Sequence, residues 1–172
     1  MIILPHHGVS PKIDPTAYLA EGVVVIGDVI IGADSSLWPH TVLRGDVFHI
    51  RVGNRTNIQD LSVGHVTDGT WPLLIEDDVT VGHRVVLHGC HIQSRCLIGM
   101  GSIIMDGAVV GEEAMIGAGS LVTPGTVIPP RTLAVGSPAK VKRDLSPEEI
   151  NFLSLSAANY VQTVRSYRSP CM

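Results

Sequence analysis

The sequence predicts an all-β solenoid, a parallel β-helix of stacked six-residue repeats, followed by an α-helix. Three observations predict this fold: aliphatic residues recur every six positions, small residues stand four places after each of them, and aromatic residues make up only 4% of the 172. A period of six fits neither an α-helix nor the simple alternation of a strand. It fits a coil with three faces per turn, in which each face points one aliphatic side chain inward.

The longest uninterrupted run of this repeat begins at Ile98. Its aliphatic positions are Ile98, Ile104, Val110, Ile116, Val122 and Ile128. The small residues four places later are Ser102, Ala108, Ala114, Ser120, Thr126 and Thr132. The alternative is a β-sandwich of short strands, but strands of a sandwich do not hold one fixed period over 31 residues.

Earlier runs hold the same period and extend the solenoid. Their aliphatic positions are Val25, Ile31, Leu37, Leu43, Ile75, Val81 and Leu87. The register slips near residues 48–52 and 87–98, where the coil must adjust. Since stacked coils share one core, residues 13 to 140 should form roughly seven turns. Glu113 stands at a repeat position that should face solvent.

A different pattern begins at Ser146. Ser146 suits the N-cap of a helix, Pro147 suits the first helical position, and acidic residues follow at the positive end of the helix dipole. Apolar residues then recur at spacings of three and four, which predicts a helix of about 20 residues with one apolar face. We therefore expect a β-helix unit over residues 1–143 and a helical segment over residues 144–172, packed on the β-helix or on a neighbouring subunit.

Composition excludes several classes of partner. A net charge of -4 and a pI near 6.0 give no electrostatic reason to expect nucleic acid. The sequence has no apolar run of the length that a bilayer needs, and its first residues do not form a signal peptide. Cys90, Cys96 and Cys171 lack the spacing of a zinc ribbon and are typical of reduced thiols, which predicts a cytoplasmic protein. A redox pair of Cys90 and Cys96 is the alternative.

Candidate chemistry lies in residues 43–91, where three histidines fall in two short segments. His65 and His83 are separated by three repeats, one full coil, so the sequence predicts that they share a repeat position, with His88 around the next corner. Neutral imidazoles are the commonest ligands of zinc, and three of them leave a fourth position for water. Iron or cobalt also suits imidazole. The alternative is that all three are structural histidines.

A polar cluster precedes these histidines. Arg44 and Asp46, two residues apart, can emerge on one side of the coil and form charge-assisted hydrogen bonds. Gln59 and Asp60 add an amide and a second carboxylate. The remaining histidines have no partner pattern and are expected to be surface or packing groups, with His91 at a small corner position. They are His6, His7, His40, His49 and His91.

These segments resemble the gamma-class carbonic anhydrases and their close relatives. The resemblance runs from about residue 10 to the C-terminal helix. The matching stretches are IGDVIIGADSSLWPHTVLRGDV, IRVGNRTNIQDLSVGHV, IEDDVTVGHRVVLHGCHI and VGSPAKVKRDLS. The resemblance implies a left-handed β-helix, a homotrimer, a zinc ion at each of three interfaces, and reversible hydration of CO2 to bicarbonate.

The resemblance also implies roles for single residues. His65 and His88 would come from one subunit and His83 from its neighbour. Arg44 and Asp46 would pair across the interface. Two further residues would act beside the metal: Gln59 would help to place the metal-bound water or bicarbonate, and Asp60 would support the site.

The chain departs from the best-studied members of that family at two points. They carry a glutamate directly after the Arg-Gly-Asp, where this chain has Val47, and they have a long acidic loop where Asp68 is here the only acid. Proton transfer should therefore limit turnover. Two alternatives remain: a non-catalytic metal-binding trimer, and an acyltransferase, since acyltransferases share both the repeat and a connector like Gly136-Ser137-Pro138-Ala139-Lys140.

Overall fold

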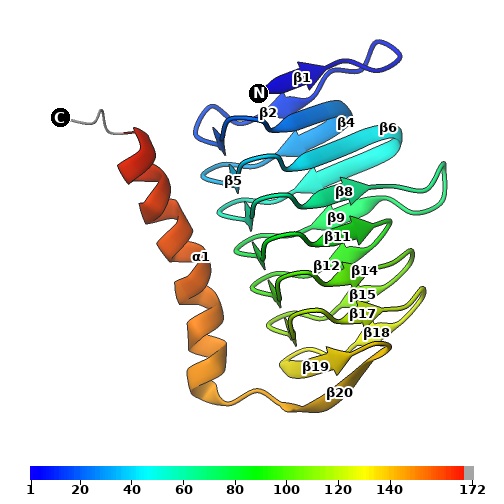
Figure 1. Cartoon of the computed structure of the whole chain (residues 1–172), viewed down its shortest axis with the longest axis vertical. Helices are drawn as coiled ribbons and strands as arrows, with labels where there is room; N and C mark the ends of the chain where they lie inside the picture. Colours follow the sequence, from blue (N-terminus) through cyan, green and yellow to red (C-terminus); the bar gives the residue numbers. More distant parts are fainter. Residues whose placement is uncertain (169–172) are drawn as a thin grey trace.

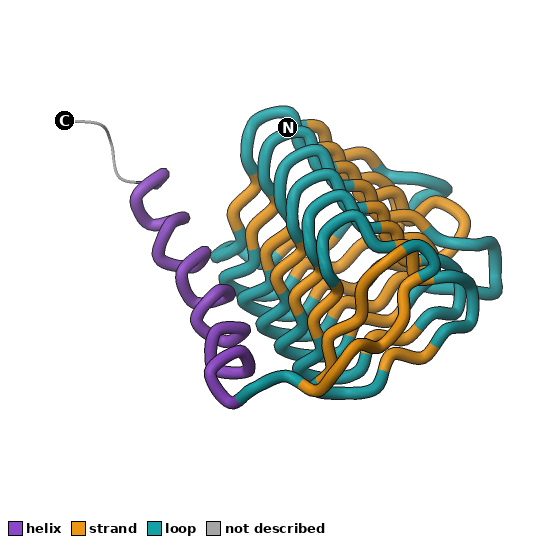
Figure 2. The backbone as a smooth tube through the Cα atoms, turned by 60° about the horizontal axis from the view of Figure 1, so that its bottom comes forward, coloured by secondary structure: helices purple, strands orange, loops and turns teal. Residues whose placement is uncertain are grey.

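The computed structural model describes residues 1–168 and shows a parallel β-helix with one α-helix along its side (Figure 1). The backbone winds in coils that stack along one axis (Figure 2). A 12-stranded sheet covers two of the three faces, because the long strands β4 and β6 run round the corner between them, and an 8-stranded sheet forms the third. The predicted fold is confirmed.

Successive coils contribute parallel strands to each face. The first face holds β1 (Ile2–Leu4), β4 (Val24–Ile31), β6 (Val42–Val52), β8 (Val63–His65), β11 (Val86–His88), β14 (Ile103–Ile104) and β17 (Leu121–Val122). The second face, which continues from the ends of β4 and β6, holds β2 (Lys12–Ile13), β9 (Leu73–Ile75), β12 (His91–Ile92), β15 (Val109–Val110) and β18 (Val127–Ile128). The third face holds β3 (Tyr18–Leu19), β5 (Ser36–Leu37), β7 (Asn57–Ile58), β10 (Thr80–Val81), β13 (Leu97–Ile98), β16 (Met115–Ile116), β19 (Thr132–Gly136) and β20 (Ala139–Asp144), which pairs antiparallel with β19.

The core is a narrow column of aliphatic side chains. All of the aliphatic positions predicted from the repeat are at most 2% exposed. Aromatic rings only flank this column, where Tyr18 and Phe48 are partly buried against it. Burying this column stabilises the fold by about 25 cal/mol per Å² of apolar surface removed from water.

One polar prediction fails. Glu113, expected to face solvent, is only 8% exposed. Its carboxylate accepts hydrogen bonds from Nε of Arg95 at 2.9 Å and from Nε of Arg131 at 2.6 Å. The three residues occupy the same position of successive coils, so Glu113 ties together neighbouring turns.

Coil length changes in the middle of the solenoid. A regular coil spans three repeats, as it does between Val25 and Leu43. The coil is longer by three between Leu43 and Gly64, longer by five between Gly64 and Leu87, and shorter by one between Leu87 and Ile104. The slips predicted near residues 48–52 and 87–98 are confirmed. A third change, the five-residue insertion between β8 and β9, has no counterpart in the predicted repeat.

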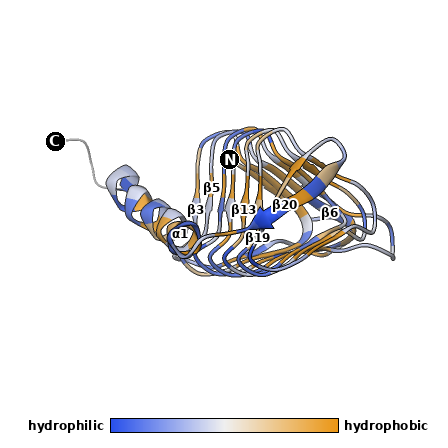
Figure 3. Cartoon of the chain, turned by 90° about the horizontal axis from the view of Figure 1, so that it is seen from below, coloured by the Kyte–Doolittle hydropathy of each residue, from blue (hydrophilic) through white to orange (hydrophobic). Residues whose placement is uncertain are grey.

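Helix α1 (Pro147–Arg168) lies beside the third face, along β3, β5 and β13 (Figure 3). Its buried residues are Leu153, Ala157 and Val164. Ser146 caps it as predicted, since the backbone N–H of Glu149 donates to Oγ of Ser146 and the Glu149 carboxylate accepts from the backbone N–H of Ser146. Within the described residues, no helix combines the length and apolar character that a membrane span requires. The division expected at residue 143 stays a prediction.

Candidate metal centre

His65 and His88 lie side by side at the ends of β8 and β11. They are partners in the parallel ladder, and Nδ1 of His65 lies 3.0 Å from Nε2 of His88. Because the β8–β9 insertion lengthens this coil, His65 aligns with a residue five places beyond the one that an uninterrupted repeat would bring beside it. The prediction that His65 and His83 share a repeat position is therefore wrong. His83 lies at the corner between β10 and β11, before the first residue of β11, whereas His88 is the last residue of that strand. The two histidines therefore lie at opposite ends of β11.

Each of the two neighbouring histidines contacts a carboxylate through its other ring nitrogen. Nε2 of His65 lies 3.1 Å from Oδ1 of Asp46, and Nδ1 of His88 lies 2.6 Å from Oδ1 of Asp106. An ionised carboxylate only accepts hydrogen bonds, so in neutral rings these nitrogens carry the proton. The lone pairs of Nδ1 of His65 and Nε2 of His88 then face each other.

Two facing lone pairs repel unless a proton or a cation lies between them. Two nitrogens bound to one tetrahedral zinc ion at about 2.0–2.1 Å would lie about 3.3 Å apart. The observed separation of 3.0 Å is close to that value. The side chains of His65 and His88 are 19% and 37% exposed, so a hydrated ion can reach both. We call these histidines, with Asp46 and Asp106, the two-histidine half-site.

His83 forms a separate group at the other edge of the first face. Its Nδ1 lies 2.8 Å from Oδ2 of Asp60, which leaves Nε2 available, and the ring is 46% exposed. Gln59, which is 6% exposed, donates from Nε2 to Oδ1 of Asn57 and lines a cavity of about 230 Å³ together with Tyr160 of α1. Burial, and then the charge of Asp60, raise the pKa of Tyr160. We call His83, Asp60 and Gln59 the one-histidine half-site.

The two half-sites do not meet within one chain. Among residues 1–168, no group of three or more His, Cys, Asp or Glu side chains converges to hold a metal ion. The predicted set of His65, His83 and His88 is therefore divided between two edges of the β-helix. Whether two subunits complete the set is a prediction of the family resemblance.

Arg44 and Asp46 emerge on one side of the coil, as the sequence predicts. Nη1 of Arg44 donates to Oδ2 of Asp46 at 2.5 Å within the same chain. Burial opposes the charge of Asp46, but hydrogen bonds from Arg44 and His65 prevail and lower its pKa to about 2. Asp46 therefore stays ionised at neutral pH and can hold the His65 ring in one orientation.

Two residues that support His88 were not predicted. Asp106 follows β14 and binds His88, and Oγ1 of Thr67 donates to Oδ2 of Asp106 at 3.0 Å. Thr67 lies in the inserted β8–β9 loop. The only signal in the sequence is that Asp106 stands three repeats after His88, one regular coil further along the chain.

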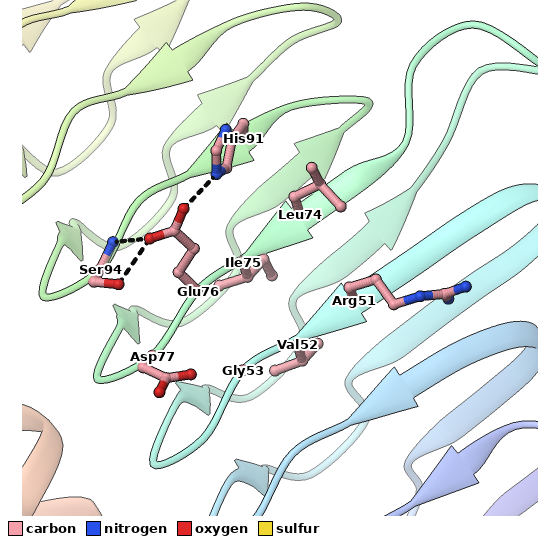
Figure 4. Close-up of a pocket in the computed structure, with 9 residues that line it drawn as sticks. All are labelled: Arg51, Val52, Gly53, Leu74, Ile75, Glu76, Asp77, His91 and Ser94. Atoms are coloured by element: carbon pink, nitrogen blue, oxygen red, sulfur yellow. Dashed lines mark hydrogen bonds and ion pairs between the residues drawn. The ribbon is translucent and has the colours of Figure 1, made fainter.

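His91 is paired elsewhere and does not join either half-site. Figure 4 shows its ring beside Glu76. Nε2 of His91 lies 2.7 Å from Oε1 of Glu76, and Ser94 donates to Oε2. These residues line a cavity of about 530 Å³ on the second face. His91 occupies an outward position of β12 and not the corner position predicted for it. Its structural role agrees with the prediction.

The described cysteines are not reactive thiolates. Cys90 and Cys96 are at most 2% exposed, and burial raises the pKa of both thiols, that of Cys96 to about 12. A thiol that stays protonated at neutral pH is a poor nucleophile and a poor redox partner. The alternative of a redox pair therefore finds no support, and Cys171 lies outside the described residues.

The fold, with the two histidine half-sites at its edges, defines a left-handed β-helix protein of the hexapeptide-repeat class. Residues 72–105 match the family model "Hexapeptide repeat of succinyl-transferase", and residues 89–124 match "Bacterial transferase hexapeptide (six repeats)". A carbonic anhydrase of Geobacillus kaustophilus is 49% identical over 168 residues, which cover 98% of this chain and 92% of that protein. The chain therefore belongs to the gamma-class carbonic anhydrase family.

Two further comparisons show how wide this family is. The mitochondrial gamma carbonic anhydrase 2 of Arabidopsis thaliana is 46% identical over 93% of this chain and 59% of that protein. A Bacillus cereus crystal structure described as an acetyltransferase superposes with a TM-score of 0.94, at 49% identity over 96% of both chains. Because relatives with both descriptions are equally similar to this chain, only its own side chains can separate the two activities.

Proposed function

We propose that this chain forms a homotrimer, binds a zinc ion at each of its three interfaces, and catalyses the reversible hydration of CO2 to bicarbonate. The observation that supports this best is the pairing of three histidines, His65, His83 and His88, each with its own carboxylate. Such carboxylates commonly orient the histidines that bind metals. One ring nitrogen of each histidine remains for the ion, and a fourth position remains for water.

An apolar stripe on the first face supports the trimer. Its outward-pointing residues are in register from coil to coil, and all are aliphatic. They are Val24, Val42, Val63, Val86, Ile103 and Leu121. Val63 and Ile103 are 38% and 41% exposed in the single chain. A continuous exposed apolar surface of this kind is typical of a protein interface.

The half-sites lie on the two edges of that same face. His83 precedes β11, and His88 ends it. In a closed ring of three copies, each interface takes one edge from each neighbour, so each would combine one two-histidine half-site with one one-histidine half-site. Three complete sites per trimer would result, with His65 and His88 from one subunit and His83 from the next.

The chain's own residues would divide the remaining tasks. When bound, a divalent ion supplies Lewis-acid chemistry that lowers the pKa of a coordinated water to about 7. Asp46, Asp60 and Asp106 would hold the three imidazole rings in place. The amide of Gln59 lies on the His83 side and would hydrogen-bond the bicarbonate oxygen atoms. Iron or cobalt would suit the same nitrogen donors.

The test is to measure metal content and CO2 hydration on one sample purified without chelators. We expect about one transition-metal ion per subunit, a trimeric mass, and hydration that exceeds the uncatalysed rate. Replacing His65, His83 or His88 singly with Ala should remove most of the metal and leave the circular dichroism spectrum unchanged, because none of them fills the core. His91→Ala is the matched control and should keep its metal. Full metal content in the three site variants would refute the proposed centre.

Two other functions give different results in the same experiment. A non-catalytic metal-binding trimer would contain the metal but would not hydrate CO2 with zinc, iron or cobalt. An acyltransferase, which the Bacillus cereus relative makes a specific alternative, would transfer the acetyl group of acetyl-CoA to an amine and would not need the metal. A set of three histidines with three carboxylates has no use in that reaction, where one catalytic histidine suffices, so it favours the hydratase.

A further inference from the structure

Hydration of CO2 releases a proton that this chain must export. Each turnover converts CO2 and H2O into HCO3⁻ and H⁺. The two positions at which the family resemblance would place an acceptor offer little, since Val47 is aliphatic and 42% exposed, and Asp68 is an exposed residue of the β8–β9 loop. The acceptor must therefore come from elsewhere in the fold.

A cavity of about 260 Å³ beside the two-histidine half-site is lined by three imidazoles. Its lining includes Asp46 and Val47 together with His6, His7 and His49. One carboxylate thus belongs to both places, because Asp46 also binds Nε2 of His65. The cavity lies where the side chain after the Arg-Gly-Asp emerges.

Two local features of the backbone bring the imidazoles together. The loop between β1 and β2 carries two of them, and its bend is fixed by hydrogen bonds of 2.9 Å in both directions between the backbones of His6 and Val9. His7 has a φ of 45° at the tip of that bend. The third, His49, lies in the stretch of β6 between Gly45 and Ile50 that contains the three extra residues of its coil, and its ring packs 4.5 Å from that of Phe48. The six-residue repeat contains neither feature, so no partner for these histidines is visible in the sequence.

We propose that His6, His7 and His49 accept the proton released by hydration and pass it to buffer in the surrounding water. This proposal rests on the proposed function. A ring nitrogen takes up the proton to give an imidazolium ion, and a buffer base then removes it, so the histidines return to their starting state. The cluster would serve where the best-studied members of the family carry a glutamate.

Imidazole is suited to this task because its ordinary pKa, about 6.5, lies near neutral pH. Some charged groups around the cavity lower the pKa of a nearby imidazole and others raise it. Burial and then the charge of Arg51 lower the pKa of His49, and the carboxylate of Asp28 opposes them. Asp28 itself is paired with Arg51 at 2.8 Å, near Lys12, and Asp46 is paired with Arg44. Each carboxylate that lines the cavity is thus paired with an arginine.

The geometry of the described residues does not make this histidine cluster a second metal site. Within residues 1–168, three or more metal-binding side chains do not converge anywhere in the chain. The rings of His6 and His7 instead pack against each other, with centroids 4.1 Å apart at 68°. Proton uptake needs no such convergence, because water within the cavity can connect the rings.

The test compares wild type with a variant that carries His6→Asn, His7→Asn and His49→Asn. Asn keeps the polarity, does not titrate near neutral pH and tolerates the positive φ of His7. His40→Asn is the control, since His40 also has a positive φ, 61°, and lies outside the cavity. Each protein is loaded with zinc, and its metal content and circular dichroism are measured. The single variants His6→Asn and His49→Asn serve if the triple variant does not fold.

Two measurements decide the outcome. In weak buffer, kcat of the triple variant should fall about tenfold or more and recover on addition of imidazole, while kcat/KM and zinc content stay at wild-type values. Proton NMR of metal-free and zinc-loaded protein should show three imidazole signals that respond to pH and vanish in the variant. An unchanged kcat in weak buffer, or three imidazoles that do not titrate, would overturn the proton-export proposal and leave the hydratase intact. Wild-type protein that does not hydrate CO2 with zinc, iron or cobalt would overturn both.

Discussion

Replacing Asp106 with Asn should weaken zinc binding and leave the β-helix folded. The carboxylate accepts from Nδ1 of His88 at 2.6 Å and from Oγ1 of Thr67 at 3.0 Å. An Asn side chain can still accept from His88 through its oxygen, and the hydroxyl of Thr67 can rotate to accept from the amide nitrogen. The substitution therefore removes mainly the negative charge that makes the opposite ring nitrogen a stronger donor to a metal ion.

The expected magnitude follows from the exposure of the pair. Loss of a carboxylate partner to a metal-binding histidine typically costs 10- to 100-fold in affinity, or about 1.4–2.8 kcal/mol. The side chains of His88 and Asp106 are 37% and 32% exposed, so water screens the charge and the cost for Asp106→Asn should be near tenfold. Asp106→Ala also frees the ring to rotate and should approach 100-fold. Thr67→Val leaves the charge of Asp106 in place and removes only one hydrogen bond that orients the carboxylate, so its effect on zinc affinity should be smaller, about 0.5–1 kcal/mol.

The assay is competition for zinc against a chromophoric chelator, with circular dichroism and thermal unfolding as checks of the fold. Asp68→Asn is the matched control, because Asp68 is an exposed acid of the β8–β9 loop whose carboxylate forms no hydrogen bond or ion pair within residues 1–168. The order of zinc affinity should be wild type and control first, then Thr67→Val, Asp106→Asn and Asp106→Ala. Equal affinity across the whole series would refute the reasoning, since His88 could then not be a ligand oriented by this carboxylate.

Three further predictions concern the core, the stacking of coils and the subunit interface. Ile116→Asp would bury an unpaired carboxylate among aliphatic side chains at a cost of several kcal/mol, so this variant should not give soluble folded protein on expression. Glu113→Ala should cost about 1–3 kcal/mol in urea unfolding at pH 7, because it leaves two arginines without their shared partner. Those arginines lower the pKa of Glu113 in the folded protein. Their stabilisation of the fold is therefore present above pH 4.5, the ordinary pKa of glutamate, and is lost as the pH falls through the lower folded-state pKa. An equal loss of unfolding free energy in Glu113→Ala at pH 7 and at pH 3 would contradict this. Co-expressed His83→Ala and His88→Ala chains should recover about a quarter of wild-type zinc binding, since random assembly gives one interface in four a complete site, whereas mixed trimers without zinc would place all three ligands on one chain.

The repeat could be predicted because each of its positions is fixed by packing. An inward position such as Ile104 or Ile116 must be aliphatic in every coil, so the period is visible in the sequence without any structure. The start of α1 could be predicted for a similar local reason, since Ser146 and Glu149 satisfy backbone groups only a few residues away. Interactions that act within six residues, or that repeat every six, leave a pattern that can be read directly.

The residues of the candidate site can be picked out in the sequence, but which of them lie side by side cannot. The sequence contains His65, His83 and His88, but which of them lie together depends on the number of residues in each coil. A six-residue period does not reveal residues that leave the coil as a loop. The five-residue insertion after β8 is therefore not visible in the repeat, and counting in sixes aligns His65 with the wrong histidine. The prediction for Glu113 failed for another reason. It assumed that a charged residue at that repeat position faces solvent, and it ignored the arginines one coil before and one coil after, which bind the carboxylate. Their spacing of three repeats from Glu113 is visible in the sequence.

The irregular coils and the candidate site coincide, and this has a physical reason. A coil of three repeats packs its three faces with no residue to spare, so it offers side chains only at fixed positions. The three-residue lengthening in β6 lets Asp46 reach His65, and the five-residue insertion brings Thr67 to Asp106 and aligns His65 with His88. In an uninterrupted solenoid, His65 would align with His83, and the two-histidine half-site would not exist. The stacked repeats thus supply rigidity, and the departures from them supply the chemistry.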